Sequence, residues 1–369
     1  MASSPIIDQT RPDQTRPDQT RPDHYSALNS WRKLYRKYSQ KLNGSLRKFL
    51  KKVDHFRLPS SCLRKIRCSC WQIEGKIFAF LNRHKNTKIP IIIQSHPSGT
   101  GFMSHFLRTL SIISYADRRG MLPVIDMRTN INAYLYKDEV GKVNSWEYYF
   151  KQPAGISLDD ALADSNAILG SSAYSYAKPN SSLGFYYNYG GELDYWQRIC
   201  SKYIHFSDAL NERLAHERRK FADKRVLGVS VRGTDYVALR NTNHSVQPDA
   251  EQVIAKAREV MDTEKFDALY ISTEDQSIIE EFRKYFAGNL ILPEQEYFDF
   301  DTSDRRAISE YTHDRPNDKY LNGLEYLASK LLLCECRGLI TSMSGGAILT
   351  MLFSQKFEYL YVFDLGVYP

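Results

Sequence analysis

The sequence has little of what marks a disulfide framework, a zinc site or a membrane anchor. It holds six cysteines in 369 residues, and no two of them form a Cys-x-x-Cys pair. Paired cysteines at that spacing are typical of zinc sites, and unpaired thiols in apolar surroundings fit a reducing compartment. No apolar run reaches the about 18 residues of a membrane span, and no signal-peptide core is present. We therefore expect a cytoplasmic protein.

Common phosphate-binding and metal-binding signatures are missing as well. Neither the Gly-x-Gly-x-x-Gly fingerprint nor a P-loop ending in Lys-Ser/Thr occurs. Dinucleotide and ATP binding are therefore not supported. No Asp-x-Asp pair stands directly at the end of a predicted strand, so we expect no metal and no cofactor.

Acidic side chains are scarce in one segment only. Residues 26–88 carry a net charge of +15, whereas residues 89–369 carry −7. A nucleic-acid-binding protein is disfavoured because its main body would be basic rather than acidic. Apolar residues recur at helical spacing between Ser30 and Val53, which predicts a basic amphipathic helical segment. Two interpretations stand for residues 26–88: peripheral contact with an anionic membrane at its inner face, or packing against the body.

The first 25 residues contain a short tandem repeat. The pentapeptide Asp8-Gln9-Thr10-Arg11-Pro12 occurs three times, and it offers almost no apolar side chain. Proline at every fifth position is incompatible with a helix, and nothing in the repeat can join a core. We predict a disordered tail over 1–25.

From residue 88 onward, apolar runs and helical patterns alternate. This order predicts an α/β fold with an N-terminal domain over 89–220 and a Rossmann-like domain over 221–369. Its sheet should be largely parallel, with ligands at the carboxyl ends of the strands. Strands are expected at 88–93, 121–126, 226–231, 268–272, 290–292, 338–341 and 358–363. Helices are expected at 103–119, 249–261, 278–285, 320–336 and 345–352.

Arg232 is the leading candidate for chemistry, because it directly follows a predicted strand that ends at Val231. Its planar guanidinium is always charged and can bind two diphosphate oxygens at once. It can also offset the charge on a departing nucleoside diphosphate. The alternative is a structural turn in which Arg232 pairs with Asp235.

Two turns rich in small residues each precede a predicted helix. Gly99-Thr100-Gly101-Phe102 lies before the first helix of the body, and Ser342-Met343-Ser344-Gly345 before the last. Backbone N–H groups at such positions can bind phosphate. A helix cap explains the second turn equally well.

Three motifs resemble those of one enzyme superfamily. Ser230–Asp235, Leu269–Asp275 and Leu339–Gly345 are similar to motifs of the α-1,2-, α-1,6- and protein O-fucosyltransferases, which include the bacterial nodulation fucosyltransferases. The resemblance extends over about residues 88–365. It implies a GT-B-like two-domain fold, GDP-fucose as donor, inversion at the anomeric carbon and no required metal.

The resemblance also implies roles for individual residues. Arg232 would bind the β-phosphate, and Asp235 would organise its loop. Ser344 and Gly345 would contact the diphosphate, with Ser342 on the same turn. The family's guanine-reading acid maps near Ser329, with Glu325 one turn away. The remaining donor-binding positions would be Ser230, Thr273, Asp275, Glu325 and Ser329, together with Gly99, Thr100, Gly101 and Phe102 from the other domain.

The chain departs from the family pattern at three positions. Ser230 stands where the family has His, Gly233 replaces its second Arg, and Arg240 stands where the α-1,6 enzymes have a Glu. The general base is therefore open among His244, Asp249 and Glu251, with His244 favoured.

Two functions follow from these residues. The first is a glycosyltransferase of polysaccharide biosynthesis that transfers fucose or a related sugar from a GDP-sugar to a glycan acceptor. The second is a catalytically inactive protein of the same fold that binds a nucleotide sugar or a glycan. Arg232 favours the enzyme, whereas Arg240 in place of a Glu favours the binding protein.

Overall fold

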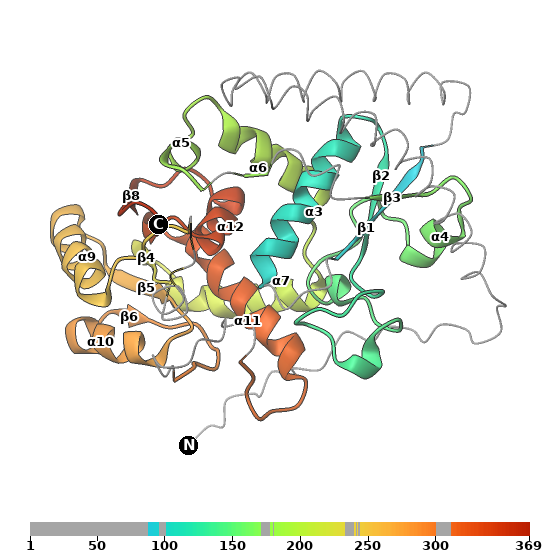
Figure 1. Cartoon of the computed structure of the whole chain (residues 1–369). Coiled ribbons are helices and arrows are strands. Elements are labelled where there is room, and N and C mark those ends of the chain that lie inside the picture. Colours follow the sequence, from blue (N-terminus) through green and yellow to red (C-terminus); the bar gives the residue numbers. More distant parts are fainter. Residues whose placement is uncertain are drawn as a thin grey trace.

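The computed structural model describes residues 88–95, 101–170, 178–179, 181–232, 240, 242, 244–299 and 311–369. The predicted tail 1–25 and all of the basic segment except Lys88 lie outside the described residues. Within the described ranges the chain forms two parallel sheets with helices between and around them (Figure 1). The predicted α/β class is confirmed. None of the helices in these ranges has both the length and the apolarity that a membrane crossing requires.

The first sheet has three parallel strands in the order β2-β1-β3. They are β1 (Pro90–Gln94), β2 (Leu122–Asp126) and β3 (Ile168–Gly170). Helix α3 (Phe102–Asp117) connects β1 to β2, and α4 (Leu158–Ala163) covers the opposite face. Since side chains alternate along a strand, a strand buried on both faces reads as a continuous apolar run. This explains why the apolar residues of Pro90–Gln94 follow one another without polar residues between them.

The second sheet has five parallel strands in the order β6-β5-β4-β7-β8. They are β4 (Val226–Ser230), β5 (Ala268–Ser272), β6 (Leu290–Ile291), β7 (Gly338–Ser342) and β8 (Tyr359–Phe363). Counted along the chain, this is the strand order 3-2-1-4-5 of a Rossmann-like sheet, as predicted. The order reverses between β4 and β7, and ligands of such sheets bind at that crossover.

Helices cover both faces of the second sheet. One face packs on α9 (Ala250–Glu264) and α10 (Gln276–Phe286), and the other on α11 (Asp318–Leu332) and α12 (Gly345–Phe353). The single-turn helix η6 (Leu333–Glu335) continues α11 toward β7. Of the apolar residues in β4, Val226 faces α11 and α12, whereas Leu227 and Val229 face α9 and α10.

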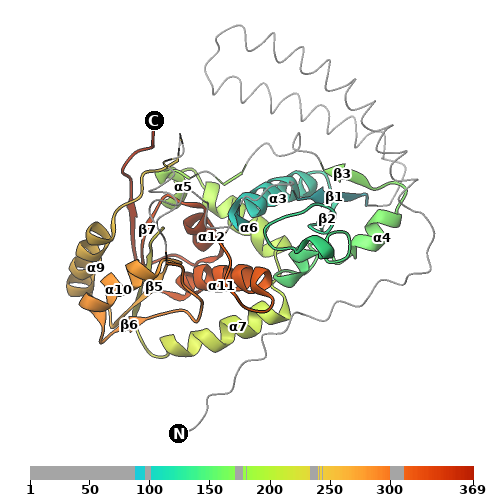
Figure 2. The same ribbon diagram turned by 60° about the horizontal axis from the view of Figure 1, so that its bottom comes forward.

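The chain between the two sheets forms α5 (Leu183–Tyr186), α6 (Glu192–Tyr203) and α7 (Asp208–Arg218). Short 3-10 turns lie at η1 (Lys137–Glu139), η2 (Ser145–Tyr148) and η4 (Arg219–Phe221). Helix α6 packs against α3 and α12, and α7 packs against α11. In Figure 2, α6 lies between the two halves beside α3 and α12, and α7 runs along the lower side of α11. The predicted domain boundary near residue 220 stays a prediction.

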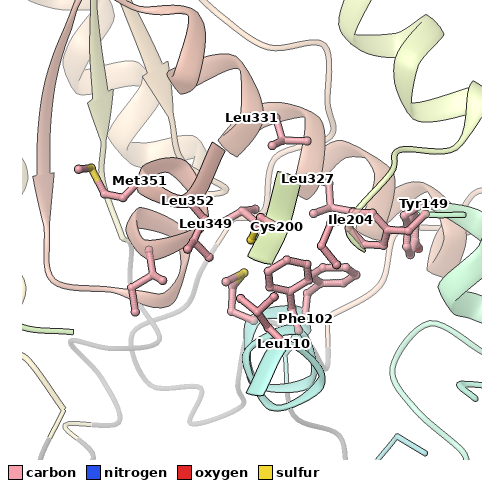
Figure 3. Packing of buried hydrophobic residues seen from close by; sticks show 14 of the residues in the cluster. Phe102, Leu110, Tyr149, Cys200, Ile204, Leu327, Leu331, Leu349, Met351 and Leu352 are labelled. Carbon is pink, nitrogen blue, oxygen red and sulfur yellow. The ribbon is translucent and has the colours of Figure 1, made fainter. Parts of the chain in front are cut away.

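The two halves share one apolar core. Figure 3 shows its centre, where side chains of α3, α6, α11 and α12 meet. The labelled members on these helices are Phe102, Leu110, Cys200, Leu327, Leu331, Leu349, Met351 and Leu352. Each of these side chains is buried. The core fixes where the loops of the first sheet lie relative to the β4–β7 crossover.

Candidate functional site

Arg232 stands two residues beyond the end of β4, at the crossover of the second sheet. Its Nη1 donates a hydrogen bond to Oε2 of Glu274 over 3.3 Å. The Arg232 side chain is 20% exposed and that of Glu274 is 22% exposed. The pair is therefore mostly buried, with about a fifth of each side chain exposed. Pairing with Asp235, the structural alternative from the sequence, lies outside the described residues.

Glu274 follows β5, the strand that pairs with β4. The carboxyl ends of neighbouring parallel strands meet at one edge of the sheet, which brings Glu274 to Arg232. The sequence drew attention to its neighbours Thr273 and Asp275 but not to Glu274. The signal that would have found it is its place directly after the strand end, equivalent to that of Arg232.

Lys330 lies beneath this pair, on the buried side of α11. Its Nζ donates to Oγ of Ser230 and to the carbonyl oxygen of Ser272, each over 3.3 Å. Burial lowers the pKa of Lys330 to about 8, Glu274 raises it, and Arg232 lowers it further. The ammonium therefore lies within electrostatic reach of both side chains. The sequence analysis missed Lys330, although a lone cation in the apolar run 327–333 was a visible signal.

The turn after β7 forms the N-terminus of α12 at the other side of the crossover. Oγ of Ser344 accepts a hydrogen bond from the N–H of Ala347, so Ser344 caps the helix. The Tyr186 hydroxyl contacts both the N–H and the carbonyl of Ser344 over 3.2 Å. A Cβ on Gly345 would lie 2.8 Å from Cβ of Met103, so only glycine allows this approach of α3. The helix cap, which the sequence left as the alternative explanation of this turn, is present at Ser344, and the role of Ser344 in binding a diphosphate stays a prediction.

The start of α3, in the first half, lies against the start of α12, where Met103 contacts Gly345. Gly101 precedes α3, and the ring of Phe102 packs edge-on against that of Tyr134, with 5.4 Å between the ring centroids. Burial raises the pKa of Tyr134, Glu274 raises it further and Arg232 lowers it. Gly101 and Phe102 therefore lie on the side of the molecule where Arg232 is found. Gly99 and Thr100 lie outside the described residues.

Several predicted donor-binding residues make hydrogen bonds within the fold. The Ser342 hydroxyl bonds to the side-chain oxygen of Gln247, which is itself buried. The Ser329 hydroxyl bonds to that of Ser272 over 2.6 Å. Asp275 caps α10 by accepting hydrogen bonds from both the N–H and the hydroxyl of Ser277. Their roles in donor binding stay predictions.

Glu325, one turn from the position where the family has its guanine-reading acid, is held by an arginine. Its two carboxylate oxygens accept hydrogen bonds from Nη1 and Nη2 of Arg315 over 2.7 and 2.8 Å. Nε of Arg315 donates to Asp318 over 2.8 Å. Glu325 could accept hydrogen bonds from a nucleotide base only if Arg315 gave up part of its contact with this carboxylate.

Thr273 is buried at the end of β5, where its carbonyl oxygen accepts a hydrogen bond from the side chain of Gln295.

His244 lies against the segment that follows β8. Its carbonyl accepts from the N–H of Tyr368, and the N–H of Val246 donates to Gly366, each over 2.9 Å. The residue is exposed. Of the other candidate bases, Asp249 is the N-cap of α9. The general base stays open.

The arrangement suits an anion. Arg232 pairs with Glu274, and the buried Lys330 lies at the ends of β4 and β5. Helix α12 follows β7, the strand next to β4, so its N-terminus adds a positive dipole end at the same edge of the sheet. A carboxylate, phosphate or diphosphate at this edge of the sheet would be stabilised by these groups together.

Known proteins resemble this chain in the arrangement of helices and strands. No protein-family profile matches the chain, and no curated protein sequence matches it. Among solved structures, NodZ α-1,6-fucosyltransferase with GDP is 14% identical, with 73% of this chain and 93% of that chain covered and a TM-score of 0.44. Fucosyltransferase NodZ from Bradyrhizobium is also 14% identical, with 73% of this chain and 94% of that chain covered and a TM-score of 0.44.

The protein O-fucosyltransferase POFUT1 with GDP is 12% identical, over 75% of this chain and 98% of that chain, with a TM-score of 0.47. These neighbours are fucosyltransferases, the class whose motifs the sequence resembles. Similarity at this level concerns the arrangement of helices and strands and identifies no activity.

Proposed function

We propose that this chain is a glycosyltransferase that uses a nucleoside diphosphate sugar, with GDP-fucose as the favoured donor. The observation that carries the proposal is the position of Arg232 at the β4–β7 crossover, mostly buried and following the strand next to the one that leads into α12. The motif resemblance around Arg232, Ser344 and Gly345 supports the same assignment. The acceptor would be a glycan, such as a bacterial surface polysaccharide or a lipid-linked glycan.

In this proposal Arg232 binds the diphosphate and stabilises it as it leaves. Negative charge grows on the diphosphate as the bond to the sugar breaks, so a fixed guanidinium contributes most in the transition state. The free N–H groups at the start of α12 and the backbone near Phe102 would contact the same phosphates. Asp235 would order the loop, and His244 would accept the acceptor's proton.

The direct test is to compare Arg232→Ala with the wild type in GDP binding and in sugar transfer. Loss of one charge-assisted contact should reduce kcat/KM by roughly 30- to 1000-fold. Arg337→Ala is the matched control, because Arg337 precedes β7 at the opposite edge of the same sheet and is 67% exposed. Unchanged transfer by Arg232→Ala would remove the proposal.

The donor's base and sugar need a separate screen. GDP, UDP and TDP should be compared by thermal shift, and Glu325→Gln tested against each. We expect GDP to stabilise the protein, and selectivity for GDP to weaken in Glu325→Gln. Stabilisation by UDP or TDP but not by GDP would replace GDP-fucose with another donor while leaving the role of Arg232 intact.

A binding protein without activity is the second candidate, and Arg240 in place of the family's Glu favours it. Arg240 has a left-handed backbone with φ of 43°. Tight GDP binding with neither donor hydrolysis nor transfer to any glycan would support this candidate.

The proposed metal independence predicts that sugar transfer is unchanged when EDTA is added.

Contact of residues 26–88 with a membrane is also a proposal, supported by their net charge of +15. Co-sedimentation of the full chain with anionic vesicles at low salt tests it, with neutral vesicles as the control. No binding to anionic vesicles would leave the alternative, in which these residues pack on the body.

A further inference from the structure

Two exposed tyrosine rings lie next to each other just after α5. Tyr187 is 39% exposed and Tyr189 is 70% exposed, the highest value among the large apolar side chains that the structure describes as exposed. Their rings are stacked at an interplanar angle of 23°, with 5.9 Å between the centroids. Single exposed aromatic rings are common, whereas adjacent ones on a fixed backbone are typical of binding surfaces. We call Tyr187 and Tyr189 the tyrosine platform.

The backbone beneath the tyrosine platform is fixed by local hydrogen bonds. Asn188, between the two tyrosines, has a left-handed backbone with φ of 55°. Its side-chain oxygen accepts hydrogen bonds from the N–H groups of Leu193 and Asp194 at the start of α6, over 3.1 and 3.4 Å. The N–H of Tyr189 donates to the carbonyl oxygen of Gly184 over 2.7 Å. The backbone that carries the rings is therefore ordered before a ligand binds, which lowers the entropy cost of binding.

The tyrosine platform adjoins the proposed diphosphate site. Tyr186, one residue before it, is buried and contacts the backbone of Ser344 at the start of α12. The Tyr187 hydroxyl lies 3.5 Å from the carbonyl oxygen of Leu360 in β8, and Figure 1 accordingly shows α5 next to β8 and α12. Since β8 is the second strand from β4, which Arg232 follows, about 10 Å separates these two strands.

The side chains around the tyrosine platform suit a neutral sugar ring. Residues 181–191 carry no charged side chain and consist only of Ser, Leu, Gly, Phe, Tyr and Asn. A sugar ring has C–H groups on its faces and hydroxyls at its rim, so it can pack flat on an aromatic ring while its hydroxyls find polar partners. Anionic headgroups and phosphorylated peptides require cations instead, and this segment has none.

We propose that the tyrosine platform is a subsite for an oligosaccharide acceptor and holds a sugar ring that does not itself react. The inference rests on the proposed function, because the reacting hydroxyl of the acceptor must lie beside the diphosphate at Arg232. A monosaccharide at that position does not reach the platform near β8. A longer acceptor contacts both places, and the platform binds it equally well before and during the reaction, which lowers KM without raising kcat.

The test begins with binding of the full chain to an array of neutral oligosaccharides of increasing length, without a donor. The glycan bound best is then titrated by calorimetry into the wild type and its variants. Tyr189→Ala should weaken binding by about tenfold, because it removes the ring on which the sugar packs. Tyr189→Phe keeps that ring and should stay within about threefold of the wild type. Tyr285→Ala is the matched control, since Tyr285 is 54% exposed and lies on α10.

Transfer assays separate the platform from the donor site. Tyr189→Ala should raise KM for the oligosaccharide by about tenfold, with kcat and the affinity for GDP unchanged. KM for a monosaccharide acceptor should not change. If Tyr189→Ala does not fold, Tyr189→Ser repeats both measurements.

Three results would overturn the proposal. The first is a wild type that binds no neutral oligosaccharide, or one that Tyr189→Ala matches in affinity. The second is a wild-type dimer in sedimentation equilibrium that Tyr189→Ala dissociates while glycan affinity stays the same, which would assign the rings to a contact between copies. The third is faster hydrogen exchange of residues 26–88 in Tyr189→Ala with unchanged glycan affinity, which would assign the rings to that segment.

Failure of the proposed function gives a different result from failure of the platform. If Arg232→Ala leaves GDP binding and transfer unchanged while Tyr189→Ala loses glycan binding, the proposed function fails and glycan binding at the platform stands. If Arg232→Ala loses transfer while Tyr189→Ala keeps its glycan affinity, only the platform fails.

Discussion

A buried ammonium is unfavourable for folding, and Lys330 is such a group. Its pKa falls from 10.5 to about 8 through burial, against the raising effect of Glu274 and with the lowering effect of Arg232. Between these pH values the unfolded chain binds a proton that the folded protein has released. The contribution of Lys330 to the free energy of unfolding therefore increases as pH rises from about 8 to 10.5.

Lys330→Met should accordingly be more stable than the wild type at pH 7, by a few kcal/mol at most, at about 1.4 kcal/mol per pKa unit. The difference should shrink as pH rises toward 10.5. Urea unfolding of both proteins at several pH values measures it, and comparing the two cancels the titration of shared tyrosines. A pH-independent difference would contradict the assigned pKa.

At the scale of single residues, the sequence predicted individual residues of the site but not the residues that they contact. The position of Arg232 followed from an apolar run ending at Val231. Its meeting with Glu274 depends on which strand lies beside β4, and its proximity to Lys330 depends on how α11 crosses the sheet. Neither is encoded locally, so both partners were missed.

At the scale of elements, α11 packs on the first half through a glycine. A Cβ on Gly323 would collide with the hydroxyl and ring of Tyr149 and would lie 3.0 Å from Tyr134. The Tyr149 hydroxyl donates to the carbonyl of Tyr320 over 3.0 Å, and the two rings are stacked. Gly323 therefore allows α11 to approach Tyr149 closely and to form these contacts with the first half.

Gly323→Ala should lower the free energy of unfolding by roughly 1–3 kcal/mol, the range for overpacking a core. Chemical denaturation measures this change. Gly288→Ala is the control, because a Cβ there meets no atom within 4 Å and the backbone needs no left-handed conformation. Equal stability of Gly323→Ala and the wild type would show that Tyr149 can move aside freely.

The strands and helices of the second half were predicted almost completely, because each is a clear apolar run or helical pattern. Helices α6 and α7 were not predicted. In α7 the buried face includes Arg213 and Glu217, which form an ion pair over 3.0 Å. Charged residues at buried positions hide the helical period, although Ser207 before α7 was a visible cap signal.

At the scale of the whole molecule, the shared core unites two halves that the sequence separates. Residues of α3 and of α11 and α12, more than 200 positions apart, belong to one buried cluster. Composition and periodicity carry no information about contacts at that separation. The two α/β halves could therefore be predicted, and the single core between them could not.

This core predicts that the halves unfold together. Scanning calorimetry of the wild type should give one transition with equal calorimetric and van't Hoff enthalpies. Independent domains with a small polar interface would separate instead. Two resolved transitions, or proteolytic release of a folded piece over 221–369, would contradict the prediction.

The pairing of residues 244–246 with 366–368 has a consequence for biosynthesis. The connection that follows Arg232 is synthesised more than 100 residues before the segment that it pairs with. On the ribosome, β4 and β5 can therefore associate early, whereas residues 244–246 can pair only after residues 366–368 have emerged. The pairing of residues 244–246 with residues 366–368 is therefore a late step of folding, after the association of β4 with β5.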